Sequence, residues 1–147
     1  MAKKYLNVTQ EAGRNFVQRN ISGNVVMLNL LKFKAVADYA QSPELAPAQP
    51  ISGEEAYQKY IEHTLPFLKA SGGEMLFYGE GGHFLIGPEE EYWEVAMLIR
   101  QKSVDSFLTF ESNAAYQQGI GHRTAALKDS RLLPLVENLT IVQENED

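Results

Sequence analysis

The sequence contains no cysteine. This absence excludes disulfides, cysteine-based zinc and iron–sulfur sites, and a thiol nucleophile. The chain also has no apolar run long enough to cross a membrane, which takes about 18 residues. An excess of positive charge is missing too, because 13 Lys and Arg stand against 19 Asp and Glu, for a net charge of −6. Nucleic acids and anionic membranes repel such a surface, so we expect neither as a partner.

The length and composition are those of one globular domain. The 147 residues are 44% hydrophobic, which is enough to bury a sizeable core. We expect a single domain over residues 1–147, made of a helical extension (1–23), a core (24–142) and an acidic tail (143–147). Polar residues interrupt the N-terminal segment where a signal peptide would be apolar, so we expect a cytoplasmic protein.

Hydrophobic periodicity predicts alternating strands and helices. Residues 24–34 are almost continuously apolar, as in a central strand. Further strands are expected at 74–79, 92–101 and 132–142, with 80–82 as a bulge or turn and 83–86 as a continuation or partner strand. Helices are expected after three cap residues, Ser52, Ser103 and Ser112. Pro66 should kink or interrupt the first of these helices, and Thr9 should cap a short helix before the core.

This β-α-β-β-α-β order predicts an α+β, ferredoxin-like fold, an antiparallel sheet with two helices on one face. The other face has no helix of its own. Since residues 24–34 are apolar on both sides, something must cover that face. A second copy of the chain is the simplest cover, so we expect a homodimer.

Several runs in the core resemble a known family. They are residues 25–33 (VVMLNLLKF), 52–60 (SGEEAYQKY), 72–73 (GG), 110–116 (FESNAAY) and 123–132 (RTAALKDSRL). Over residues 25–142 the chain is similar to domain-of-unknown-function family thirteen-thirty, in the dimeric α+β-barrel superfamily. The resemblance implies two ferredoxin-like protomers that pack their sheets into a barrel. The superfamily includes cofactor-free and haem-degrading monooxygenases, lactone isomerases and stress-related proteins, so the fold does not select a function.

The histidines offer acid–base chemistry but no metal site. His63, His83 and His122 show no ligand spacing with one another or with a carboxylate, so we expect no bound metal. His83 follows two glycines and is expected in a surface turn. His63 and His122 are the candidate general acid or base groups.

Asn29, Trp93 and His122 occur in the chain order found in haem-degrading relatives, which use an Asn, a Trp and a His. However, the interval from Trp93 to His122 is longer than that pattern has. The alternative interpretation is a buried amide, a core indole and a surface imidazole. We therefore expect no tightly bound cofactor.

Arg123 and Tyr116 are the preferred ligand-binding residues, because the resemblance places both on the second helix beside the sheet. Arginine keeps its charge, so a half-buried Arg123 needs an anion. That anion is either a protein carboxylate, namely Glu111, Glu94 or Asp129, or a small carboxylate or enolate ligand. Tyr60, with Tyr57 and Tyr78, is a further candidate for the lining of such a pocket.

These features lead to a functional hypothesis. We expect a homodimer with a pocket between sheet and helices that binds or transforms a small organic molecule, of carboxylate or enolate type, without a tightly bound cofactor. A noncatalytic ligand-binding or dimerisation module is the first alternative. A monooxygenase-like enzyme is the second.

Overall fold

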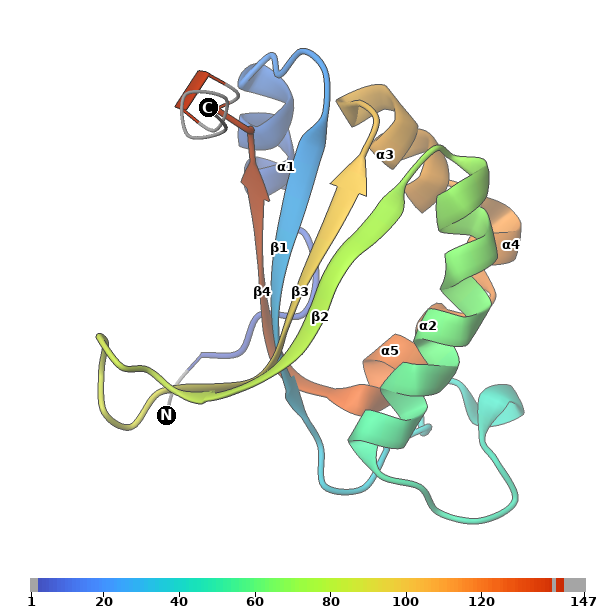
Figure 1. Ribbon diagram of the computed structural model, residues 1–147. Helices are drawn as coiled ribbons and strands as arrows, with labels where there is room; N and C mark the ends of the chain where they lie inside the picture. The colour runs from blue at the N-terminus through green and yellow to red at the C-terminus, as the bar shows by residue number, and fades with distance from the viewer. Residues whose placement is uncertain (1–2, 139, 142–147) are drawn as a thin grey trace.

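Four strands form one antiparallel sheet in the order β2-β3-β1-β4. In this computed structural model, which describes residues 3–138 and 140–141, the strands are β1 (Val25–Phe33), β2 (Glu74–His83), β3 (Tyr92–Gln101) and β4 (Leu127–Leu135). α2 (Gly53–Ala70) joins β1 to β2, and α3 (Val104–Glu111), α4 (Ala114–Gln117) and α5 (Ile120–Ala126) join β3 to β4. Figure 1 shows α2 and α5 packed together beside the sheet. The ferredoxin-like prediction is confirmed.

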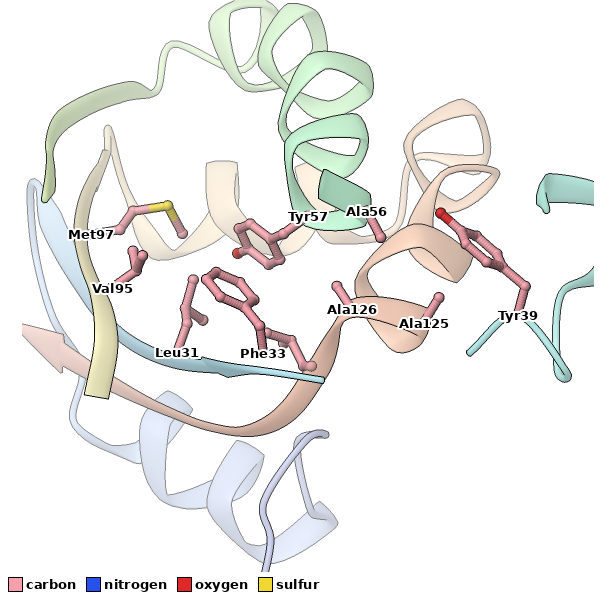
Figure 2. Packing of buried hydrophobic residues seen from close by; sticks show 10 residues of the cluster. Leu31, Phe33, Tyr39, Ala56, Tyr57, Val95, Met97, Ala125 and Ala126 are labelled. Atoms are coloured by element: carbon pink, nitrogen blue, oxygen red, sulfur yellow. The ribbon is translucent and has the colours of Figure 1, made fainter. Parts of the chain in front are cut away.

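The core lies between the sheet and α2. Alternate residues of β1 and β3 point toward the helix, because side chains along a strand alternate between its faces. Leu31 and Phe33 of β1 pack with Tyr57 of α2, and Val95 and Met97 of β3 complete this side of the cluster (Figure 2). The main hydrophobic cluster therefore fixes α2 over the middle of the sheet.

The N-terminal segment runs beside the edge strand β4. Tyr5 accepts hydrogen bonds at its carbonyl from the main-chain N–H of Ser130, at 3.1 Å, and from the Ser130 hydroxyl, at 2.6 Å. Thr9 then caps α1 (Gln10–Gln18), as predicted. The Phe16 ring of α1 contacts Phe107 of α3 edge to face, with centroids 6.0 Å apart. The extension is thus attached both to β4 and to the helical layer.

The last strand does not lie where its apolar residues predicted it. β4 begins at Leu127, directly after α5, and ends at Leu135. The predicted strand at 132–142 is therefore wrong in both bounds. Residue 142, where that predicted strand ends, lies outside the described residues. The polar run 128–131 conceals the start of the strand. Its polar groups are satisfied locally, because Asp129 accepts a hydrogen bond from the Tyr5 N–H at 2.8 Å and pairs with Arg131 at 2.8 Å.

The segment between α3 and β4 divides at different residues from those predicted. Ser112 is the C-terminal cap of α3, and it is Asn113 that caps α4, accepting from the Ala115 and Tyr116 N–H groups at 2.8 and 3.1 Å. Gly119 starts α5 against the imidazole ring of His63, and a Cβ at this position would overlap that ring. Glycine is therefore required at position 119, between α4 and α5, because the His63 ring occupies the space that a side chain would need.

Two elements run on where an interruption was one of the expected outcomes. α2 continues through Pro66 without interruption, and its buried side chains before and after the proline, Tyr57 and Leu68 among them, hold both halves against the core. β2 is also continuous through residues 80–82, and its register shift lies earlier, between Met75 and Phe77.

His83 is the exposed last residue of β2, paired with Tyr92 on β3, rather than a turn residue. Beyond it, residues 84–86 do not form a strand, and Leu85 is completely exposed. No helix in the described part of the chain is long and apolar enough to cross a membrane.

The proline-rich loop after β1 covers α5 rather than the face of the sheet. Tyr39 is buried in the main cluster, and the loop forms a 3-10 turn at Pro43–Leu45. Ser42 and Leu45 lie so close to Gly121 that a Cβ there would contact both side chains. The loop therefore packs on α5 within the fold.

Candidate functional site

A cavity of about 220 Å³ lies between the sheet and the helices. Its walls come from β1 and β3, from α2 and the α3–α5 segment, and from residues 6–8 before α1. Most of the lining is apolar, including Met27, Met97, Ile99, Phe107 and Phe110. Nine polar side chains share this apolar space, namely Asn7, Asn29, Tyr57, Tyr60, Thr64, Gln101, Glu111, Tyr116 and Arg123. An apolar cavity with few polar groups is the usual form of a small-molecule site.

Arg123 lies half-buried in α5 and contributes its guanidinium to this cavity. Its Nη1 donates to the main-chain carbonyl of Leu6 at 2.8 Å. No carboxylate of the described residues lies within 4.0 Å of Arg123. Of the two alternatives for Arg123, the internal ion pair is absent from the described residues, and the guanidinium has a neutral main-chain partner.

Two of the predicted ion-pair partners are engaged elsewhere. Asp129 pairs with Arg131, and Glu94 accepts a hydrogen bond from the Phe33 N–H at 3.0 Å. Only Glu111 shares the cavity with Arg123.

Glu111 ends α3 with its carboxyl facing the cavity. Burial raises the pKa of this carboxyl above its ordinary value, and the positive charge of Arg123 acts against that rise. A carboxyl group with a raised pKa is a candidate proton donor and acceptor. The sequence indicated Glu111 only as an ion-pair partner, since the residue order contains no sign of its burial.

Two tyrosine hydroxyls meet at the cavity wall. Tyr60 of α2 and Tyr116 of α4 are hydrogen-bonded at 2.7 Å, and the Tyr116 ring stacks on Phe110 with centroids 4.4 Å apart. Burial raises the pKa of both hydroxyls, so both keep their protons at neutral pH. Tyr57 is also in the lining, and its hydroxyl forms no hydrogen bond with the described residues.

Asn29 is another predicted ligand-binding residue that lies in the cavity lining. It lies in the middle of β1, where its Nδ2 donates to the Met27 carbonyl at 3.2 Å. Four of the five predicted ligand-binding residues therefore line one cavity: Arg123, Tyr116, Asn29 and Tyr60.

Trp93, the fifth, is not in the lining. Its ring is buried between two cations, with Lys32 Nζ 4.8 Å and the Arg131 guanidinium 4.9 Å from its centroid. Its Nε1 donates to Glu91 at 3.2 Å. The indole thus forms a cation–π cluster elsewhere in the molecule.

The two candidate acid–base histidines also lie outside the lining. His63 Nε2 is 2.9 Å from the Ala115 carbonyl, and His122 Nδ1 is 2.8 Å from the Tyr39 hydroxyl. Burial lowers the pKa of His122, and the charges of Lys59 and His63 lower it further. Of the haem-type pattern, only Asn29 reaches the cavity. Among the described residues, no three His, Asp or Glu side chains cluster as metal ligands would.

Comparison with known proteins places this fold in a family. Residues 49–138 match the family described as "Domain of unknown function (DUF1330)". The chain belongs to the DUF1330 family. No curated protein matches it.

Two solved structures of one bacterial protein are similar to this DUF1330 chain. The RPA0582 protein of unknown function from Rhodopseudomonas palustris is 28% identical, over 90% of this chain and 96% of that one, with a TM-score of 0.79. Its methylated form matches over 91% and 95%, also at 28% identity, with a TM-score of 0.80. A dimeric ferredoxin-like protein of unknown function from Thermobifida fusca is 10% identical over 79% and 92%, with a TM-score of 0.45.

Proposed function

We propose that this DUF1330 protein binds a small organic acid, of carboxylate or enolate type, in the cavity between sheet and helices. The observation that carries the proposal is the incomplete hydrogen bonding of the Arg123 guanidinium. A guanidinium has five N–H donors, and among the described residues only the Leu6 carbonyl accepts a hydrogen bond from it. A half-buried cation without a carboxylate at hydrogen-bonding distance is suited to accept an anionic ligand.

The size of the cavity limits the ligand. A volume of about 220 Å³ is below the range of roughly 300–1,000 Å³ common for drug-sized ligands. A ligand of a few carbon atoms with one acid group fits this volume and the apolar lining. No tightly bound cofactor is part of the proposal.

Glu111 and the tyrosine pair favour catalysis over a passive binding module. One hydroxyl of the Tyr60–Tyr116 pair donates to the other, which leaves one neutral hydroxyl proton near Arg123, and such a donor stabilises an enolate oxygen. Glu111 supplies a carboxyl whose raised pKa suits proton transfer. Enolate chemistry is shared by isomerases and cofactor-free monooxygenases, so both reaction classes stay within the proposal.

The proposed assembly is a homodimer formed through the uncovered face of the sheet. One row across all four strands carries Phe77, Leu98, Leu28 and Leu133 on that face. Phe77 is 55% and Leu133 is 54% exposed. A second copy would bury this apolar row.

A cytoplasmic location is also proposed, since a chain without cysteine needs no oxidising compartment.

The test measures the binding of a panel of small acids by calorimetry. We expect pyruvate, acetoacetate or benzoate to bind, and Arg123→Gln to weaken that binding more than tenfold. Arg14→Gln removes the same charge from the exposed face of α1 and should leave affinity unchanged. Equal affinity in the Arg123→Gln variant would contradict the proposal.

The same variant separates a ligand-binding arginine from a structural one. Arg123→Gln removes one hydrogen bond to a carbonyl, so the free energy of unfolding should fall by about 1.5 kcal/mol. Loss of a buried ion pair would cost about 3–5 kcal/mol. Urea unfolding of both proteins distinguishes these two values.

A further inference from the structure

Gln101 is a buried amide that the fold leaves without a partner. It ends β3 with 1% of its surface exposed, and its side chain lines the same cavity as Arg123. Its Oε1 is buried and forms no hydrogen bond with the described residues. Most buried side-chain amides in proteins are hydrogen-bonded, because an unpaired polar group loses its hydration without compensation. An unpaired amide on a residue of the cavity lining is therefore suited to a partner that a ligand brings.

Gln101 and Arg123 lie near opposite ends of α2. Arg123 interacts electrostatically with Tyr57 and Tyr60, in the first half of that helix. The Oε1 of Gln101 instead lies over Gly73, just beyond the end of α2, where a Cβ would be 3.1 Å from it. From Tyr60 to Ala70, the last residue of α2, the chain completes almost three helical turns, or about 15 Å. The cavity thus has two separate polar ends.

The wall between these ends is mainly apolar. Met97 and Ile99 of β3 and Met27 of β1 line it on the sheet side, and Leu65 lines it from α2. Asn29 and Thr64 add two polar side chains to this section. An apolar middle section accepts methylene groups and rejects charge. A ligand that uses both ends must therefore have an apolar spacer between two polar groups.

We infer that Gln101 is a second recognition residue of this cavity, and that the ligand is a small hydroxy acid. Its carboxylate binds Arg123, and its hydroxyl, at the far end of an apolar spacer, donates to Gln101 Oε1. The inference rests on the proposed function and goes further by naming the ligand class. It assigns specificity for the hydroxyl group to a residue that sequence analysis did not identify.

The test compares two acids that differ only in the hydroxyl, hexanoate and 6-hydroxyhexanoate, by calorimetry. We expect the protein to bind 6-hydroxyhexanoate about tenfold more tightly, the effect of one buried hydrogen bond. Gln101→Met keeps the size of the side chain and removes the amide, so it should abolish this preference. Arg123→Gln should weaken the binding of both acids by the same factor. Gln18→Met, on the exposed face of α1, is the matched control and should keep the preference.

Thermal unfolding supplies an independent measurement. Replacing an unpaired buried amide by an apolar side chain removes a desolvation cost, so Gln101→Met should have a Tm equal to or above that of the parent. A lower Tm would assign the amide a structural role and overturn the inference.

The failures of the two proposals are distinguishable. If both acids bind through Arg123 with equal affinity, or if Gln101→Met keeps the preference, the hydroxyl specificity is wrong and the acid site stands. If binding is unaffected by Arg123→Gln, the acid site itself is wrong, and the inference fails with it.

Discussion

At the scale of single residues, burial decides what Glu111 can do. Its carboxyl shares the cavity with Arg123 and with the hydroxyls of Tyr60 and Tyr116. Burial raises its pKa, the charge of Arg123 opposes the rise, and the net direction is upward. The folded protein therefore holds this proton more tightly than the unfolded chain does.

This shift predicts how stability depends on pH. A raised folded-state pKa contributes stability that is complete below the unfolded value of 4.5 and is lost as pH rises through the folded-state pKa. Glu111→Gln removes this titration, so its free energy of unfolding, relative to that of the parent, should increase from pH 4 to pH 8. Urea unfolding across that range measures the difference. Glu44→Gln, at an exposed position, controls for the loss of one negative charge. A difference that decreases with pH would contradict the burial of the Glu111 carboxyl.

At the scale of elements, the start of α2 combines a local signal with a tertiary one. Ser52 Oγ accepts from the Glu55 N–H at 3.0 Å, and Glu55 Oε1 accepts from the Ser52 N–H at 3.1 Å. This capping box was readable from the sequence. Glycine is needed at position 53 for a tertiary reason. Its Cα lies against the carbonyls of Lys34 and Ala126, where a Cβ would overlap both.

The contact at Gly53 predicts an unusual glycine substitution. Ala is normally the better helix former, by about 1 kcal/mol. Gly53→Ala should nevertheless lower the free energy of unfolding by about 2–3 kcal/mol, because backbone atoms of two elements must move. Gly13→Ala in α1 is the matched control, since a Cβ there has only an ordinary contact with Val8 at 3.6 Å. That variant should be as stable as the parent or more so in urea unfolding. Equal behaviour of the two variants would disprove the close contact.

At the scale of the whole molecule, the uncovered face of the sheet determines the assembly that we propose. Leu133 pairs with Leu28 on that face and is 54% exposed. Because an apolar row of this kind is unfavourable in water, it is suited to pack against its own copy.

The proposed dimer predicts a molecular mass. Light scattering at micromolar concentration should give about 33 kDa, twice the chain mass of 16.5 kDa. Leu133→Asp introduces a charge into the proposed interface and should give a folded monomer. Val36→Asp places the same charge at a position that is 61% exposed and lies outside the sheet, so it should leave the dimer intact. A parent protein of 16.5 kDa would rule out the barrel.

Much of the fold followed from local patterns. Alternation in residues 92–101 and the continuous apolar run of β1 predicted two central strands, which the register confirms. The same reasoning misplaced β4, because the polar residues that begin this strand are satisfied by Tyr5, far away in the chain. It also failed at Pro66, since a local rule for proline takes no account of packing along both halves of α2.

The amino-acid sequence by itself determined the order of the elements, the cap of α2, and a short set of residues that includes Arg123 and Tyr116. The order of the elements and the cap follow from periodicity and side-chain chemistry, which act over a few residues, and the two site residues follow from the resemblance to a known family. Only the tertiary structure decided that Arg123 has a carbonyl rather than a carboxylate as its partner, and that the buried Oε1 of Gln101 has no partner in the described part of the chain. Burial and pairing depend on contacts between residues far apart in the chain, and no local pattern encodes them.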